Sequence, residues 1–155
     1  MRRDAERGLT LTELTIVTAL ASLVMVGLVS FYINSQGVWL DSSSQALTQR
    51  DATLILETFA THARAASSAY WNPDYHALTL SYRDTDQTYQ FAWRTDLDSM
   101  LYAGADTAST RIGLSKVSRF EVSTSPAMVS LDTLELVPAS GHPIGVSSSF
   151  ALYNR

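Results

Sequence analysis

Glu13 is the residue whose type and position most clearly require a chemical partner. Between Glu13 and Asp41 no side chain carries a formal charge, and residues 9–32 are almost all apolar or threonine. A carboxylate within a bilayer costs about 2 to 3 kcal/mol or more, so a buried acid of this kind is expected to meet a cation. The simplest such cation is an amine.

No other residues of the chain form a recognisable catalytic group. The sequence contains no GxSxG, HExxH, Walker glycine-lysine loop or paired-glycine fingerprint. His62, His76 and His142 are scattered, without the spacing of metal ligands. We therefore expect structural histidines, no cofactor and no enzymatic activity.

The residues in front of Glu13 form a motif. A charged leader with three arginines ends at Gly8, and Glu13 is the fifth residue after this glycine. The sequence Gly-Leu-Thr-Leu-Thr-Glu at 8–13 resembles the cleavage and N-methylation motif of type IV prepilins and type II secretion pseudopilins. The resemblance covers about residues 7–32. It implies that prepilin peptidase cuts after Gly8 and methylates Leu9, and that Glu13 compensates a terminal amine when subunits pack into a filament.

The motif departs from the family pattern in two respects. Leu9 stands where phenylalanine is usual, but both residues are apolar, so processing is still expected. Thr12 and Thr15 stand where large aliphatic residues are commoner. Threonine hydroxyls can donate to the carbonyl four residues earlier, so both positions are compatible with a helix in lipid.

Two other interpretations of this segment remain open. Thr10 and Glu13 fit the S/T-x-x-E capping box, in which the acid closes the first turn of a helix, and this role is compatible with pairing. The tripeptide at 19–21 (Ala-Leu-Ala) resembles the cleavage site of a secretory signal. However, the apolar region before it is short and contains Glu13, and the apolar run continues to Phe31.

Residues 9–32 are long enough to cross a membrane as one helix. At about 1.5 Å per residue they span roughly 36 Å, compared with a hydrocarbon core of roughly 30 Å. The arginines of the leader, residues 1–8, favour the cytoplasmic side, and the first charge after the span is Asp41. We therefore expect a single-pass protein of the bacterial inner membrane, with a cytoplasmic N-terminus and a periplasmic or extracytoplasmic head.

The charge and the cysteine count exclude some classes of function. The formal net charge is −4, and removal of residues 1–8 takes away three arginines and two acids, which leaves −5. This balance argues against a general phosphate-binding surface, so nucleic acid is not an expected partner. The chain has no cysteine, which excludes disulfide and thiolate chemistry.

The polar segment 33–69 keeps a helical rhythm, which predicts an amphipathic continuation of the first helix. Weak helix formers at 34–37 and 41–44 would allow a kink or a loosened turn. Asn72 and Pro73 favour a turn that ends the helix. The apolar residues that set the rhythm are Val38, Leu40, Leu47, Leu54, Ile55, Phe59 and Ala63.

From residue 70 onward the apolar period changes to two. Residues 78–82 and 89–93 alternate and are joined by 84–87, which predicts a β-hairpin with an aromatic face. We therefore predict an α+β, pilin-like fold in which a long N-terminal helix, transmembrane and then amphipathic, packs on the antiparallel β-sheet of a head at 70–155. Further strands are expected around 100–102, 117–124, 131–137 and 146–153.

Aspartates in the expected loops are weak candidates for calcium ligands, because some pseudopilins bind calcium through carboxylate oxygens. The order of a calcium-binding loop, with its glycine and terminal glutamate, is absent. We therefore expect solvated turn acids and no metal. The aspartates concerned are Asp84, Asp86, Asp96 and Asp98, with Asp106.

Short stretches at 36–39 and 149–155 look like the minor subunits called J-type in type II secretion and W-type in type IV pili. The resemblance implies a structural subunit that helps to initiate or cap a pilus or pseudopilus. Its partners would be prepilin peptidase, other minor and major subunits, and the inner-membrane assembly platform. The alternative is a membrane-anchored extracytoplasmic enzyme or receptor domain outside any filament, which should show a polar constellation in the head; the sequence supplies none.

Overall fold

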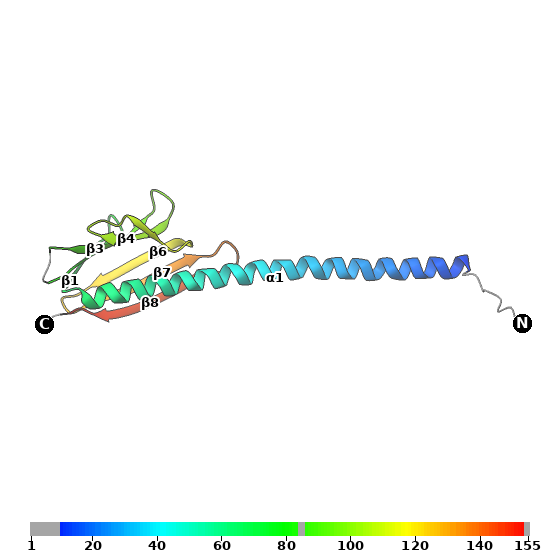
Figure 1. Ribbon diagram of the computed structural model, residues 1–155, viewed down its shortest axis with the longest axis horizontal. Coiled ribbons are helices and arrows are strands. Elements are labelled where there is room, and N and C mark those ends of the chain that lie inside the picture. The colour runs from blue at the N-terminus through cyan, green and yellow to red at the C-terminus, as the bar shows by residue number, and fades with distance from the viewer. Residues whose placement is uncertain (1–9, 84–85, 154–155) are drawn as a thin grey trace, which may run out of the picture. The chain divides into compact units, whose positions relative to one another are not determined.

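The computed structural model of the chain describes residues 10–83 and 86–153. One helix, α1 (Leu11–Ala65), is followed by antiparallel strands (Figure 1). The predicted α+β class, with a long apolar N-terminal helix and antiparallel sheets, is confirmed. The strands are β1 (Ser68–Asn72), β2 (Ala77–Ser81), β3 (Thr88–Arg94), β4 (Met100–Ala105), β5 (Thr110–Ile112), β6 (Lys116–Thr124), β7 (Met128–Val137) and β8 (Ile144–Ala151).

Helix α1 runs for 55 residues without a break, so the weak helix formers at 34–37 and 41–44 do not interrupt it. The sequence predicts a helix as far as residue 69, whereas α1 ends at Ala65. The reason is that the chain turns directly into a sheet. The N–H of Ala66 still donates to the carbonyl of His62, but the N–H of Ser67 already donates to the carbonyl of Ser81.

The first sheet has five strands in the order β1-β2-β3-β4-β5. The predicted hairpin forms its centre, because β2 pairs with β3 and Leu80 lies opposite Tyr89. The edge strands β1 and β5 were not predicted. β1 occupies residues that the sequence assigned to the end of the helix and the following turn.

The second sheet has three strands in the order β6-β7-β8. The sequence predicts one sheet, so the division into two is a correction. It arises because β5 pairs only with β4 and not with β6, which leaves the two groups of strands without a shared ladder. A register shift between Leu131 and Leu134 bends β7 where it pairs with β8.

The compact unit that contains both sheets begins at Asp41, so it includes the second half of α1. We call it the head unit. One stripe of α1 fills its core, and Phe59 lies at the centre of this stripe, fully buried. The centroid of the Phe59 ring lies 5.3 Å from the ring centroid of Phe91 in the first sheet. It lies 5.7 Å from the ring centroid of Phe150 in the second sheet. The buried residues of α1 are Thr48, Asp51, Ala52, Ile55, Phe59 and Ala63.

Asp51 is the buried acid of this stripe, with 8% of its surface exposed. Its Oδ2 accepts hydrogen bonds of 2.7 Å from the N–H groups of Leu114 and Ser115 and from the Ser115 hydroxyl. Gly113 lies against the same carboxylate at φ 76°, where a Cβ would approach the carboxyl carbon to 3.0 Å. The turn between β5 and β6 is therefore fixed to α1 through one carboxylate.

A second polar contact fixes the loop between β7 and β8 to α1. The hydroxyl of Ser140 donates to Asp41, and the N–H of Ser140 donates to the hydroxyl of Ser44 at 3.1 Å. Residues 41–44, which are weak helix formers, thus contribute polar groups to a tertiary contact. This contact explains their presence within a continuous helix.

We expect Asp51→Ala to lower the free energy of unfolding by about 2 to 3 kcal/mol, because it removes the charged acceptor of two backbone N–H groups and one hydroxyl. The measurement is urea unfolding of the full chain in mild detergent, followed by tryptophan fluorescence. Trp71 and Trp93 are partly buried against the core of the head unit and report its unfolding.

Asp132→Ala is the matched control, because Asp132 is exposed and accepts a hydrogen bond only from the Ser123 hydroxyl. We expect its effect to stay within about 0.5 kcal/mol. Equal effects of the two substitutions would contradict the role assigned to Asp51.

Candidate functional site

The first turn of α1 forms a complete capping box. The N–H and the hydroxyl of Thr10 both donate to Oε2 of Glu13 at 2.9 Å, and the N–H of Glu13 donates back to the Thr10 hydroxyl at 3.3 Å. These bonds satisfy backbone donors that a helix start leaves unpaired. Within residues 10–83 and 86–153, Oε1 of Glu13 has no hydrogen-bond partner. The acid is therefore held in place while one of its oxygens remains available.

Gly8 and Leu9, the predicted processing site, lie outside the described residues. The structure does place Glu13 on the first turn of α1, next to Thr10. The carboxylate is thus close in sequence to the predicted new amino terminus.

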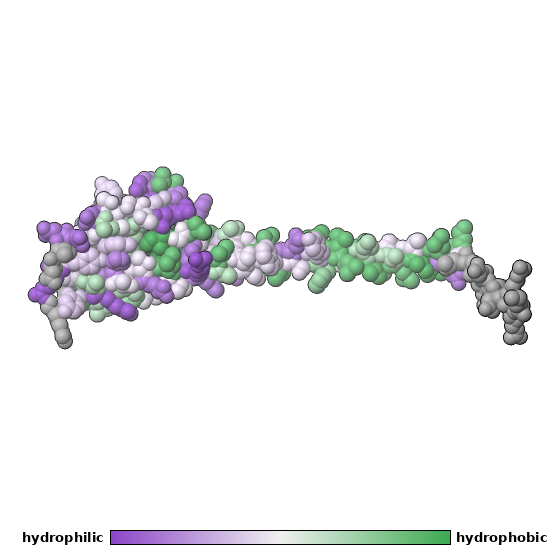
Figure 2. All heavy atoms as spheres, viewed as in Figure 1, coloured by the Kyte–Doolittle hydropathy of each residue, from purple (hydrophilic) through white to green (hydrophobic). Residues whose placement is uncertain are grey.

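The apolar surface behind Glu13 is not covered by any other part of residues 10–83 and 86–153. Every large apolar side chain from Leu11 to Leu40 is more than half exposed, and the lowest value is 54%, at Val29. An 18-residue window of α1 is long and apolar enough to cross a membrane, and none of it is buried. Figure 2 shows this hydrophobic surface along the N-terminal part of α1. The helix is a candidate for a single membrane span.

Three hydroxyl side chains of this segment are satisfied by the helix itself. The hydroxyl of Thr15 donates to the carbonyls of Leu11 and Thr12, and that of Thr18 donates to Leu14 and Thr15. The hydroxyl of Ser22 donates to Ala19 at 2.8 Å. These residues therefore present no unpaired donor to an apolar surrounding.

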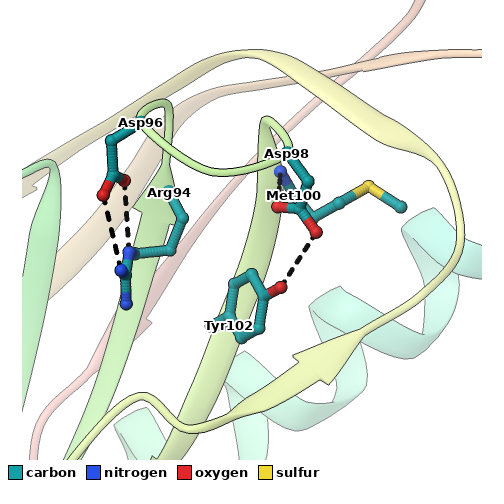
Figure 3. A network of polar contacts seen from close by, with 5 residues as sticks. All are labelled: Arg94, Asp96, Asp98, Met100 and Tyr102. Carbon is teal, nitrogen blue, oxygen red and sulfur yellow. Dashed lines mark hydrogen bonds and ion pairs between the residues drawn. The ribbon is translucent and has the colours of Figure 1, made fainter.

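The acids proposed as calcium ligands are engaged separately. Asp96 forms an ion pair of 3.2 Å with Arg94, whereas Asp98 accepts from the N–H of Met100 and from the Tyr102 hydroxyl (Figure 3). The hydrogen bond that the Tyr102 hydroxyl donates to Asp98 raises the pKa of this hydroxyl.

Three aspartates complete this set. Asp86 is exposed and Asp106 accepts from the N–H of Thr88, while Asp84 lies outside the described residues. In the part of the chain that the structure describes, no three histidine or acidic side chains gather in a group that could hold a metal ion.

One cluster of titratable side chains was missed by the sequence analysis. Nδ1 of His62 lies 2.6 Å from the Tyr82 hydroxyl, and the His62 ring stacks on Tyr89 with 3.5 Å between centroids. Burial lowers the pKa of His62 and raises the pKa of Tyr82 and of Tyr89. The signal that could have found it is position, because His62 lies one turn after the buried Phe59 on the stripe that packs on the aromatic hairpin. The cluster holds α1 against the first sheet.

The chain was compared with protein-family models, curated proteins and solved structures, and no match was found in any of the three.

We expect the head unit to lose stability as the pH falls from about 7 through the ordinary histidine pKa of about 6.5. The pKa of His62 is lower in the folded chain, so the unfolded chain binds the proton first and protonation favours unfolding. His62→Gln should flatten this pH dependence in urea unfolding. His142→Gln, at an exposed histidine, is the control and should leave the slope unchanged. An identical slope in wild type and His62→Gln would contradict the assignment.

Proposed function

We propose that this chain is a minor pilin or pseudopilin, a structural subunit that helps to initiate or cap a type IV pilus or a type II secretion pseudopilus. The observation that carries the proposal is the first part of α1. It combines an uncovered apolar surface with a single carboxylate, Glu13, held at its first turn. The leader that ends at Gly8 supports the same conclusion from the sequence.

In this proposal α1 has two environments in succession. Prepilin peptidase cuts after Gly8 in the inner membrane and methylates Leu9, and residues 9–32 then move from lipid into a bundle of similar helices. An unpaired carboxylate and an unpaired amine are each costly there, whereas together they form a charge-assisted pair. Thr10 leaves Oε1 of Glu13 free to accept from the terminal amine of a neighbouring subunit.

The head unit then lies outside the cytoplasmic membrane and meets the heads of other minor and major subunits. The inner-membrane assembly platform would take up the processed chain. The sequence contains no recognisable catalytic motif, and no acids or histidines of the described residues gather in a group that could hold a metal ion, which supports a structural role over an anchored enzyme.

The first test is processing. Intact-mass analysis of the chain from its native membrane should find a terminus at Leu9 with one methyl group on the nitrogen. Gly8→Val should block the cut, because a branched side chain crowds the backbone approach that glycine allows. Gly27→Val, within the same helix and with open space around its Cα, is the control and should still be processed. A dominant full-length chain, or a terminus at Ser22, would overturn the proposal.

The second test separates pairing from capping at Glu13. Glu13→Ala keeps a good helix former, so the variant should insert and be cut normally. Its co-purification with partner subunits should fall about tenfold or more, the change expected for loss of one charge-assisted hydrogen bond.

Two variants serve as controls for this test. Thr10→Val removes the capping hydroxyl but keeps the carboxylate, and Glu57→Ala removes an exposed acid elsewhere on α1. Loss of a cap alone costs about 0.5–2 kcal/mol at one helix end. Normal co-purification of Glu13→Ala at an unaltered membrane level would rule out the pairing role.

A further inference from the structure

The strand β8 forms a free edge of the three-stranded sheet. It pairs with β7 on one side, and in Figure 1 (red) it borders the sheet on the side away from β6. The N–H of Leu152 donates to Ala127 on the β7 side, whereas the N–H of Tyr153 donates to Ala66 at the end of α1. Along a strand the N–H and C=O groups of successive residues point alternately to the two sides. The backbone groups of Ser149 and Ala151 therefore point away from β7, on the same side as those of Tyr153.

Before Tyr153, β8 itself carries none of the usual features that protect an edge strand. The odd-numbered positions Gly145, Ser147, Ser149 and Ala151 are exposed and small, and the segment 143–153 carries no charge. Protein sheets usually shield an edge with charged side chains, proline or a short strand. The other edges show these devices, because β5 has only three residues and β1 is followed directly by Pro73.

The edge strand β6 makes the clearest contrast. It has nine residues, close to the eight of β8, but it carries exposed charges at Lys116, Arg119 and Glu121. Arg119 and Glu121 also form an ion pair of 3.2 Å. The long uncharged edge of β8 is therefore the one best suited to accept another strand.

The inner face of β8 indicates the chemistry of the added strand. Val146 and Phe150 pack against the core but remain partly exposed, so the apolar surface continues to the edge. The guanidinium of Arg64 lies 5.6 Å from the centre of the Phe150 ring and has no carboxylate partner in residues 10–83 and 86–153. A carboxylate on the added strand would supply that partner.

We propose that the free edge of β8 is a docking site for an extended segment of a partner protein, which adds as a further strand with alternating apolar and small polar side chains and a carboxylate beside Arg64. The backbone ladder supplies affinity, and Val146, Phe150 and Arg64 supply selectivity.

Antiparallel pairing of β8 with β8 of a second copy does not fit this edge. The loop before β8 contacts the segment 41–44 of α1, and the residue after β8 contacts Ala66, so β8 and this part of α1 run in the same direction. Antiparallel pairing of two β8 strands would therefore point the two helices in opposite directions. Two chains anchored in one membrane through α1 cannot adopt that arrangement, an argument that rests on the membrane anchoring in the proposed function.

The test uses the full chain in detergent micelles and a fluorescent, blocked peptide of alternating threonine and valine with one glutamate. We expect saturable binding by fluorescence anisotropy, and slower hydrogen exchange at the amides of Ser147, Ser149 and Ala151. Ser149→Pro should weaken binding about tenfold, because it removes an outward N–H while β7 pairing needs none there. Ser149→Ala is the matched control and should bind like wild type, because it changes only the side chain.

Arg64→Glu provides a variant that leaves the strand unchanged. It should weaken binding of the glutamate peptide and strengthen binding of the same peptide with lysine in place of glutamate. Equal binding by Ser149→Pro and wild type, or no exchange of preference in Arg64→Glu, would overturn the proposal. So would self-association of the chain that protects the Ser149 amide without peptide, which would make a second copy the occupant. None of these results depends on cleavage at Gly8, so a failure here is distinct from a failure of the proposed function.

Discussion

The head unit depends on one stripe of α1 that both sheets share. Buried side chains of both sheets and of α1 form one hydrophobic cluster, as expected for layers that bury their apolar faces against one another. Phe59 contacts Phe91 from the five-stranded sheet and Phe150 from the three-stranded sheet, so one side chain joins all three layers. The polar contacts of Asp51 and Ser140 then fix the turn that leads into the second sheet and the loop between its strands β7 and β8.

The two parts of α1 are both helical, but their apolar side chains have different surroundings. From Asp41 onward, the apolar stripe is satisfied by the sheets of the chain itself. Before Asp41, the large apolar side chains stay exposed in the described structure. The hydroxyls of Thr15 and Thr18 there donate to carbonyls of the helix itself. Hydroxyls that are paired in this way expose no unpaired donor to lipid, which is the condition that a bilayer sets. Glu13, the acid of this part of α1, lies on its first turn.

The elements that could be predicted from the sequence are those with a local signal. The apolar run of α1 and the alternation in β2 and β3 are both visible in a short window, and both are confirmed. β1 was missed because its aromatic residues stand directly before Pro73 and after an alanine-rich helix end, so the segment read as a turn. The separation into two sheets follows from a pairing that β5 does not make, and no local pattern encodes it.

In the candidate site, too, contacts between residues close in sequence could be predicted and contacts between distant residues could not. Thr10 and Glu13 are three residues apart, and the predicted capping box is present. The partners of Asp51 are 63 and 64 residues away, so its role depends on the tertiary fold. One signal was available, because an aspartate on the stripe of Ala52, Ile55 and Phe59 interrupts an otherwise apolar face. The roles of Gly8 and Leu9 stay predictions.

The order in which the chain is made bears on the contact between α1 and the loop before β8. Asp41 and Ser44 leave the ribosome early, but their partner Ser140 follows 99 and 96 residues later. Phe59 likewise waits for Phe150 near the end of the chain. Contacts of such high sequence separation form slowly, because the loop must close before they stabilise anything. During synthesis the apolar stripe of α1 in the head unit therefore stays uncovered until β8 is made, and an uncovered stripe of this kind is prone to aggregate.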